Sequence, residues 1–158
     1  MEKLAKLKKD YEKLQNKHKL PDFNRLNEEF EIEKLQERET DFLLRNIRSA
    51  MVEKIAVVLR FLEVIVNPTE GSAPLYIFSV MKNISSDTKK IVEKVYGTLT
   101  AMELNALALD IQYDEKKEVV FINEISKEWS NVKKHLIEIT EKLEVVWSHE
   151  KSHDGYFG

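Results

Sequence analysis

Hydrophobic residues recur at helical spacing along most of the chain. From residue 41 onward they lie three and four positions apart, which places them on one face of a helix. This first stripe consists of Leu44, Ile47, Met51, Ile55, Val58, Leu62 and Ile65. It predicts a central helix over 41–66, which starts at Thr40-Asp41 and ends at the segment 67–74, where turn-forming residues are dense.

Two more long helices are predicted after this turn. Ser85, Ser86 and Asp87 can cap a helix over 86–112 with the stripe Ile91, Val95, Leu99, Met102, Ala106 and Leu109. This stripe is widened by Leu104, Leu107, Ala108 and Ile111, so we expect this helix to be buried on more than one side. A last helix is predicted over 114–147, with the stripe Ile122, Ile125, Trp129, Val132, Leu136, Ile139, Leu143 and Val146.

The N-terminal residues carry a narrower pattern. Leu4, Leu7, Tyr11 and Leu14 form a seam at coiled-coil spacing, which predicts an amphipathic helix over residues 1–20. Pro21 interrupts it, and Asp22 can cap a new helix. We therefore predict an all-α, single-domain bundle of about five helices. It has an N-terminal arm over 1–20, a bundle over 21–148 and a flexible tail over 149–158.

Composition supports a helical protein and narrows its function. Only four Gly and three Pro occur among 158 residues, and no Cys, which excludes disulfides and thiolate metal ligands. The net charge of -3 gives no overall positive field for a nucleic acid. The most apolar run, residues 55–66, is shorter than the roughly 20 residues of a membrane span. Since no signal-peptide pattern opens the chain either, we expect a cytoplasmic protein without membrane contact.

Charge is distributed unevenly near the N-terminus. Residues 1–20 hold seven Lys and three acidic residues, and residues 22–41 hold eight acidic and three basic residues. The first helix could therefore fold back on the second through opposite charge. Alternatively, because Pro21 separates the two, the helix could project toward a partner or a second copy of the chain.

The sequence His149-Glu150-Lys151-Ser152-His153 matches H-E-x-x-H, the motif in which two His bind zinc and a Glu acts as general base. The resemblance to zinc proteases covers these five residues alone. Lys151 places a cation beside the metal position, and only five residues follow the motif, so Asp154 or His18 would have to supply a third ligand. We expect no catalytic residue, cofactor or metal ligand, with zinc binding or metallohydrolase activity as an alternative.

Three segments resemble uncharacterised helical proteins of archaea. They are L-P-D-F-N-R-L-N-E-E-F-E-I-E-K-L at 20–35, F-L-L-R-N-I-R at 42–48 and F-I-N-E-I-S-K-E-W at 121–129. The resemblance spans about residues 20–147 and implies a helical fold without an attached activity.

These observations predict a non-enzymatic protein-interaction or assembly protein, since no nucleophile elbow or phosphate-binding loop occurs in the sequence. We expect its main contact surface to be the seam of Leu4, Leu7, Tyr11 and Leu14, facing a second copy or a different protein. A further alternative is an RNA- or ribosome-associated factor. It would bind phosphates through the lysines of the first helix, Lys3, Lys6, Lys8, Lys9 and Lys13.

Overall fold

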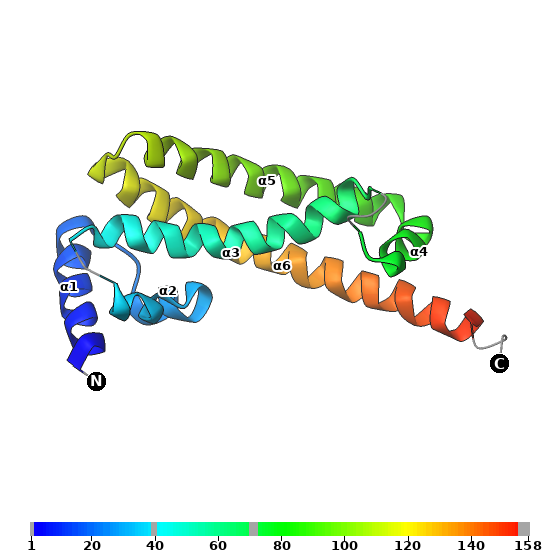
Figure 1. The fold of residues 1–158 in the computed structure, drawn as a ribbon, viewed down its shortest axis with the longest axis horizontal. Coiled ribbons are helices and arrows are strands. Elements are labelled where there is room, and N and C mark those ends of the chain that lie inside the picture. Colours follow the sequence, from blue (N-terminus) through cyan, green and yellow to red (C-terminus); the bar gives the residue numbers. More distant parts are fainter. Residues whose placement is uncertain (1, 39–40, 70–72, 155–158) are drawn as a thin grey trace. The chain divides into compact units, whose positions relative to one another are not determined.

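The computed structural model describes residues 2–38, 41–69 and 73–154, with side chains through residue 149. These residues form helices and no strand, which confirms the all-α fold class (Figure 1). The elements are α1 (Glu2–His18), α2 (Phe23–Phe30), the 3-10 helix η1 (Ile32–Glu37), α3 (Leu43–Val66), α4 (Leu75–Asn83), α5 (Ser86–Ile111) and α6 (Glu115–Asp154).

The three long helices lie where the hydrophobic stripes predict them. α6 continues to Asp154, beyond the expected end at Trp147, and residues 155–158 of the predicted tail lie outside the described residues. The described residues hold more helices than the expected five. The additions are η1 and α4, which are too short to show a stripe of several turns.

The chain divides into two compact units. Unit 1 contains residues 1–56 and 101–129, and unit 2 contains residues 57–100 and 130–158. The predicted N-terminal arm, residues 1–20, therefore belongs to unit 1 together with the residues that follow it. None of the helices in the described ranges combines the length and the apolarity that crossing a membrane requires.

In unit 1, two short helices follow α1, and a side chain caps the start of the first. The Asp22 carboxylate caps α2 by accepting hydrogen bonds from the backbone N–H groups of Asn24 and Arg25 at 2.9 and 3.2 Å. α2 ends at Glu31, which adopts a left-handed conformation with φ 54°. Lys19, just after α1, has the same φ. Two non-glycine residues thus make the turns on either side of α2.

The core of unit 1 is formed by one face from each of its helices. Its buried side chains include Leu7, Tyr11, Leu26, Phe30, Ile32, Leu35, Leu44, Ile47, Met51, Ile55, Ala106, Ile122, Ile125 and Trp129. α2 is fixed to α6 by the Trp129 ring, which lies 5.2 Å from that of Phe30 and donates a hydrogen bond to Glu29 at 3.1 Å.

Unit 2 is built from α4 and from parts of α3, α5 and α6. The Ser85 hydroxyl caps α5 by accepting the Thr88 N–H at 3.1 Å, as the sequence predicts. The buried side chains of unit 2 include Leu59, Leu62, Ile65, Ile77, Val80, Val92, Val95, Leu99, Val132 and Ile139. Residues 70–72 of the predicted turn lie outside the described residues.

Candidate functional site

The seam predicted as the contact surface packs within unit 1. Leu7 and Tyr11 are buried, and Leu4 and Leu14 are half-buried. The Tyr11 hydroxyl donates a hydrogen bond to the Pro21 carbonyl at 2.5 Å. The structure therefore has the fold-back arrangement, in which Leu7 and Tyr11 have no open surface to offer. Contact with another chain through the seam stays a prediction.

The lysines of α1 take part in the same fold-back. Lys3 pairs with Glu37 at 2.5 Å, and Lys17 pairs with Glu115 at 2.6 Å. The hydrogen bond and charge of Lys17, joined by those of His18, hold the pKa of the Glu115 carboxyl below its usual value. RNA binding by this helix stays a prediction, and it would have to compete with such pairs for the amines.

The H-E-x-x-H motif lies on the last turns of α6. Its backbone is helical, and His149 is exposed, but the side chains of Glu150 and His153 lie outside the described ones. No group of three His, Asp or Glu side chains is placed to hold a metal ion within the part of the chain that the structure describes. His18, one candidate third ligand, contacts Glu115 at 2.8 Å in unit 1. Zinc binding by the motif stays a prediction.

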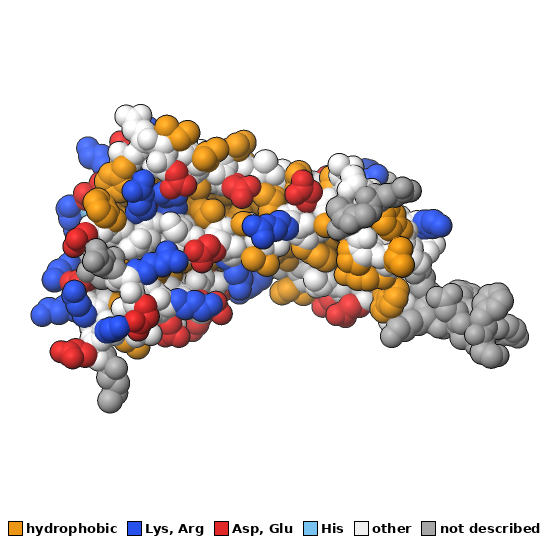
Figure 2. Space-filling view, in the orientation of Figure 1, with side chains coloured by type: hydrophobic (Ala, Val, Ile, Leu, Met, Phe, Trp, Pro, Cys, Tyr) orange, Lys and Arg blue, Asp and Glu red, His pale blue; other side chains and the backbone are white. Residues whose placement is uncertain are grey.

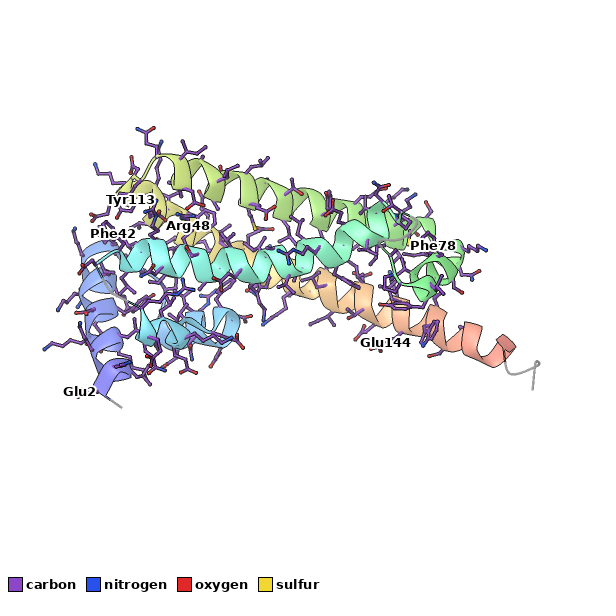
Figure 3. The ribbon with its side chains drawn as sticks, in the orientation of Figure 1. Glu2, Phe42, Arg48, Phe78, Tyr113 and Glu144 are labelled. Atoms are coloured by element: carbon purple, nitrogen blue, oxygen red, sulfur yellow. The ribbon has the colours of Figure 1, made fainter. Side chains whose placement is uncertain are left out.

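A buried cluster of charge in unit 1 was not foreseen. Arg48 of α3, labelled in Figure 3, is 1% exposed. Its Nε donates a hydrogen bond at 2.8 Å to Oε2 of Glu118, which is 0% exposed. The guanidinium also donates to the Ala106 carbonyl at 3.2 Å and to Asp110 at 2.7 Å. Burial alone would lower the pKa of Arg48, but the hydrogen bonds and charges of Asp110 and Glu118 outweigh it, so the pKa is raised.

The sequence did contain a signal for this pair. Arg48 follows Leu44 by four positions and precedes Met51 by three, so it lies on the apolar stripe of α3. Glu118 likewise precedes Ile122 by four positions on the stripe of α6. Opposite charges on two core-facing stripes indicate a buried ion pair. Such a pair joins helices and is no sign of catalysis by itself.

Unit 2 carries an apolar groove of about 390 Å³. Its lining residues are Phe61, Tyr76, Ile77, Val80, Thr140, Leu143, Glu144 and Trp147. The rings of Tyr76 and Trp147 meet edge to face, with centroids 5.8 Å apart. This groove can take an apolar group, and Glu144 is the single titratable carboxylate in its lining.

The largest departure from expectation is the outward face of α5. The second apolar stripe was expected to be buried, but Leu104 is 61% exposed, Leu107 54% and Ile111 80%. That prediction is wrong within this chain, because the core covers only the stripe through Leu99, Met102 and Leu109. Figure 2 shows hydrophobic side chains gathered over the C-terminal half of α5. We call Ala101, Leu104, Leu107, Ala108 and Ile111 the α5 face.

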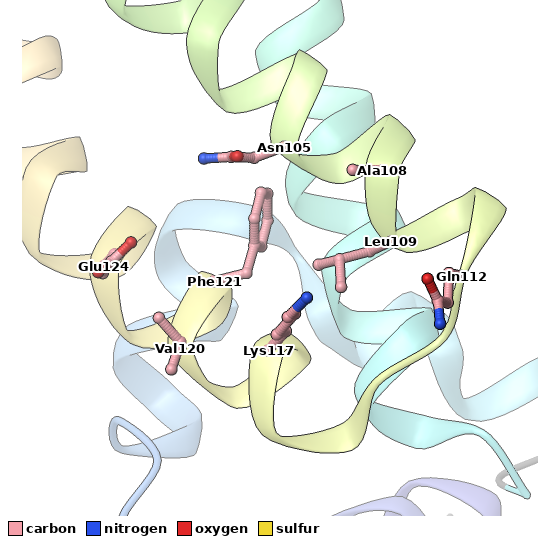
Figure 4. Close-up of a pocket in the computed structure, with 8 residues that line it drawn as sticks. All are labelled: Asn105, Ala108, Leu109, Gln112, Lys117, Val120, Phe121 and Glu124. Carbon is pink, nitrogen blue, oxygen red and sulfur yellow. The ribbon is translucent and has the colours of Figure 1, made fainter.

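A groove adjoins the α5 face within unit 1 (Figure 4). It measures about 460 Å³ and lies between α5 and α6. Its lining residues are Asn105, Ala108, Leu109 and Gln112 from α5 and Lys117, Val120, Phe121 and Glu124 from α6. Ala108 belongs to both features, so the face and the groove form one continuous surface.

This surface is better suited to binding an apolar partner than to catalysing a reaction. Its centre is aliphatic, and its polar groups are amides beside one lysine and one glutamate at the groove edge. Comparison of the chain with protein-family models, with curated proteins and with solved structures found no match in any of the three.

Proposed function

We propose that this protein is a non-enzymatic interaction or assembly protein that binds its partner through the α5 face. One observation carries the proposal: three large aliphatic side chains of one helix, Leu104, Leu107 and Ile111, are each more than half exposed and adjacent. Contiguous apolar patches of this kind mark binding sites on proteins that otherwise present polar surfaces. The α5 face thus replaces the α1 seam as the proposed contact surface.

Covering the α5 face would contribute favourable free energy to association. Full burial of a Leu or Ile side chain contributes about 1.5 to 3 kcal/mol. Scaled by the exposed fractions, covering Leu104, Leu107 and Ile111 would contribute about 3 to 6 kcal/mol. The gain is offset by the cost of association, so a partner must also supply apolar surface of its own.

The spacing of the face suits a helical partner. Ala101, Leu104, Ala108 and Ile111 follow each other at intervals of three, four and three residues, which is the spacing of coiled-coil core positions. Two of the four are alanines, whose small side chains let another helix approach closely. A partner helix lying along α5 would bury the whole face.

Photo-crosslinking tests the proposal directly. A benzophenone amino acid replaces Leu107 on the face in one variant of the full chain, and Val57, 65% exposed on α3, in a matched control. Illumination in cells should produce a discrete crosslinked protein from position 107 and none from position 57. The proposal fails if position 107 gives no crosslink, or if both positions give the same products.

A further inference from the structure

We infer that the partner at the α5 face is the same face of a second copy of this chain. The two α5 helices would pair antiparallel across a two-fold axis near residue 106. This inference rests on the proposed function and adds the partner's identity and orientation. Its support is the order of large and small side chains and the distribution of charge around them.

The side-chain order of the face favours an antiparallel register. In heptad terms, Ala101 and Ala108 occupy a positions, and Leu104 and Ile111 occupy d positions. Antiparallel pairing sets a against d. Ala101 then faces Ile111 of the second copy, and Leu104 faces Ala108, so that every layer combines one small and one large side chain. Parallel pairing would set alanine against alanine and leave gaps, which cost packing energy.

The flanking positions are compatible with self-pairing. In an antiparallel pair, e positions face e positions and g positions face g positions. On α5 the e positions are Asn105 and Gln112, and Leu107 is at g. Amides therefore meet amides, and Leu107 meets its own copy. No like charges are brought together along residues 101–112, which removes the repulsion that commonly prevents a helix from pairing with itself.

The nearest charges on α5 point away from this contact. Glu103 and Asp110 occupy c positions, and Asp110 is bound to Arg48 at 2.7 Å. On the other flank, Asn105 and Gln112 also line the groove, so a second α5 would extend cover toward the half-exposed Val120 of α6. The buried apolar area is thus larger than the α5 face alone.

The size of the contact sets its expected strength. Residues 101–111 span roughly 15 Å of helix at 1.5 Å per residue. A helix pair of this length buries less area than a typical specific interface, which covers about 800 Å² on each partner. We therefore expect a reversible dimer with a dissociation constant on the order of micromolar.

Sedimentation of the full chain measures this equilibrium. Wild-type protein should shift from monomer to dimer between about 0.1 and 100 µM, a range that brackets the expected dissociation constant. Leu104→Glu places a charge in the central layers and should weaken dimerisation by about 100-fold or more. Val57→Glu makes a similar change on an exposed residue of α3 outside the face and should leave the equilibrium unchanged.

Disulfide formation between introduced cysteines tests whether the two α5 helices pair antiparallel. The chain has no native cysteine that could form other disulfides. An Ala101→Cys variant mixed with an Ile111→Cys variant should form a disulfide-linked mixed dimer on mild oxidation. Ile111→Cys alone should form little, because antiparallel pairing separates its two copies. Efficient self-linking of Ile111→Cys would contradict the antiparallel register.

Failure of this inference is distinguishable from failure of the proposed function. A chain that stays monomeric throughout the concentration range, or a dimer that Leu104→Glu does not weaken, overturns the inference. If position 107 then crosslinks to a different protein, the α5 face still binds a partner and the proposed function stands. If position 107 crosslinks to nothing, both fail.

Discussion

Replacement of Arg48 by methionine should destabilise the protein more than any other single change to the buried ion pair. We expect Arg48→Met to lower the free energy of unfolding by about 3 to 5 kcal/mol, because it leaves a buried carboxylate without its counter-charge. Total stabilities are commonly about 5 to 15 kcal/mol, so this single change removes a large part of the margin.

The magnitude follows from what each partner of Arg48 loses. Glu118 is completely buried, and its Oε2 accepts from Arg48 at 2.8 Å, while its Oε1 has no hydrogen-bond partner among the described residues. Asp110 has a side chain that is 56% exposed and can return to water at little cost. Ala106 lies within α5, so its carbonyl keeps its helical hydrogen bond. The cost therefore falls almost entirely on Glu118.

The two partners of the ion pair should differ in how much their replacement destabilises the protein. Glu118→Leu should cost less, about 1 to 3 kcal/mol, because Arg48 keeps its bonds to Asp110 and the Ala106 carbonyl. The double variant Arg48→Met/Glu118→Leu should recover most of the loss, since apolar residues of similar volume can replace a buried ion pair at little or no cost.

Urea unfolding of the four proteins in this cycle, followed by circular dichroism, gives the required free energies. A free energy of unfolding for Arg48→Met within about 1 kcal/mol of the wild-type value, which is the loss caused by an average point substitution, would refute a buried uncompensated charge. Such a charge is also refuted if the double variant is as unstable as Arg48→Met, because the loss would then come from packing and not from an uncompensated charge.

Three further predictions concern other parts of the molecule. Gly97→Ala should raise stability by about 1 kcal/mol in urea unfolding, because the added Cβ meets no atom within 4 Å and alanine favours the helix; a loss would indicate a hidden constraint on α5. Tyr11→Phe should cost about 1 kcal/mol near neutral pH through the lost bond to Pro21. Burial, aided by the charge of Asp22, raises the pKa of Tyr11, so the folded state keeps this proton above the unfolded value of about 10. Wild-type stability should therefore fall as pH rises past 10, and the gap to the Phe variant should narrow; a constant gap would contradict this. Finally, acrylamide should quench Trp147, 38% exposed, and hardly Trp129, 4% exposed, so Trp147→Phe should remove most of the quenchable fluorescence; unchanged quenching would place the exposed ring elsewhere.

The long helices could be predicted because their stripes run over many turns. α3 and α5 begin and end within two residues of the expected positions. The end of α2 was harder to predict from the sequence, because the left-handed residue at its end is Glu31. A glycine at that position would have indicated the turn. The Asn27 side chain contributes there by accepting the Glu33 N–H at 2.9 Å, a contact that no periodic pattern encodes.

The sequence predicted apolar helix faces, but it did not predict which of them would remain exposed. Hydrophobic spacing shows that a face avoids water, but it does not show what covers the face. For Leu7 and Tyr11 the cover is the same unit, whereas Leu104 and Ile111 remain exposed. Both stripes have the same spacing in the sequence, so only the folded structure distinguishes them.

The two left-handed residues, Lys19 and Glu31, should make the stretch around α2 unfold locally more readily than the long helices. Each holds a backbone conformation that costs a side-chain-bearing residue about 1 to 2 kcal/mol, and both costs are concentrated in the short stretch around α2. Opening that stretch releases the strain without unravelling the long helices. Amide hydrogens of α2 should therefore exchange with solvent through a local fluctuation of lower free energy than those of α3, so that this stretch opens before α3 under native conditions.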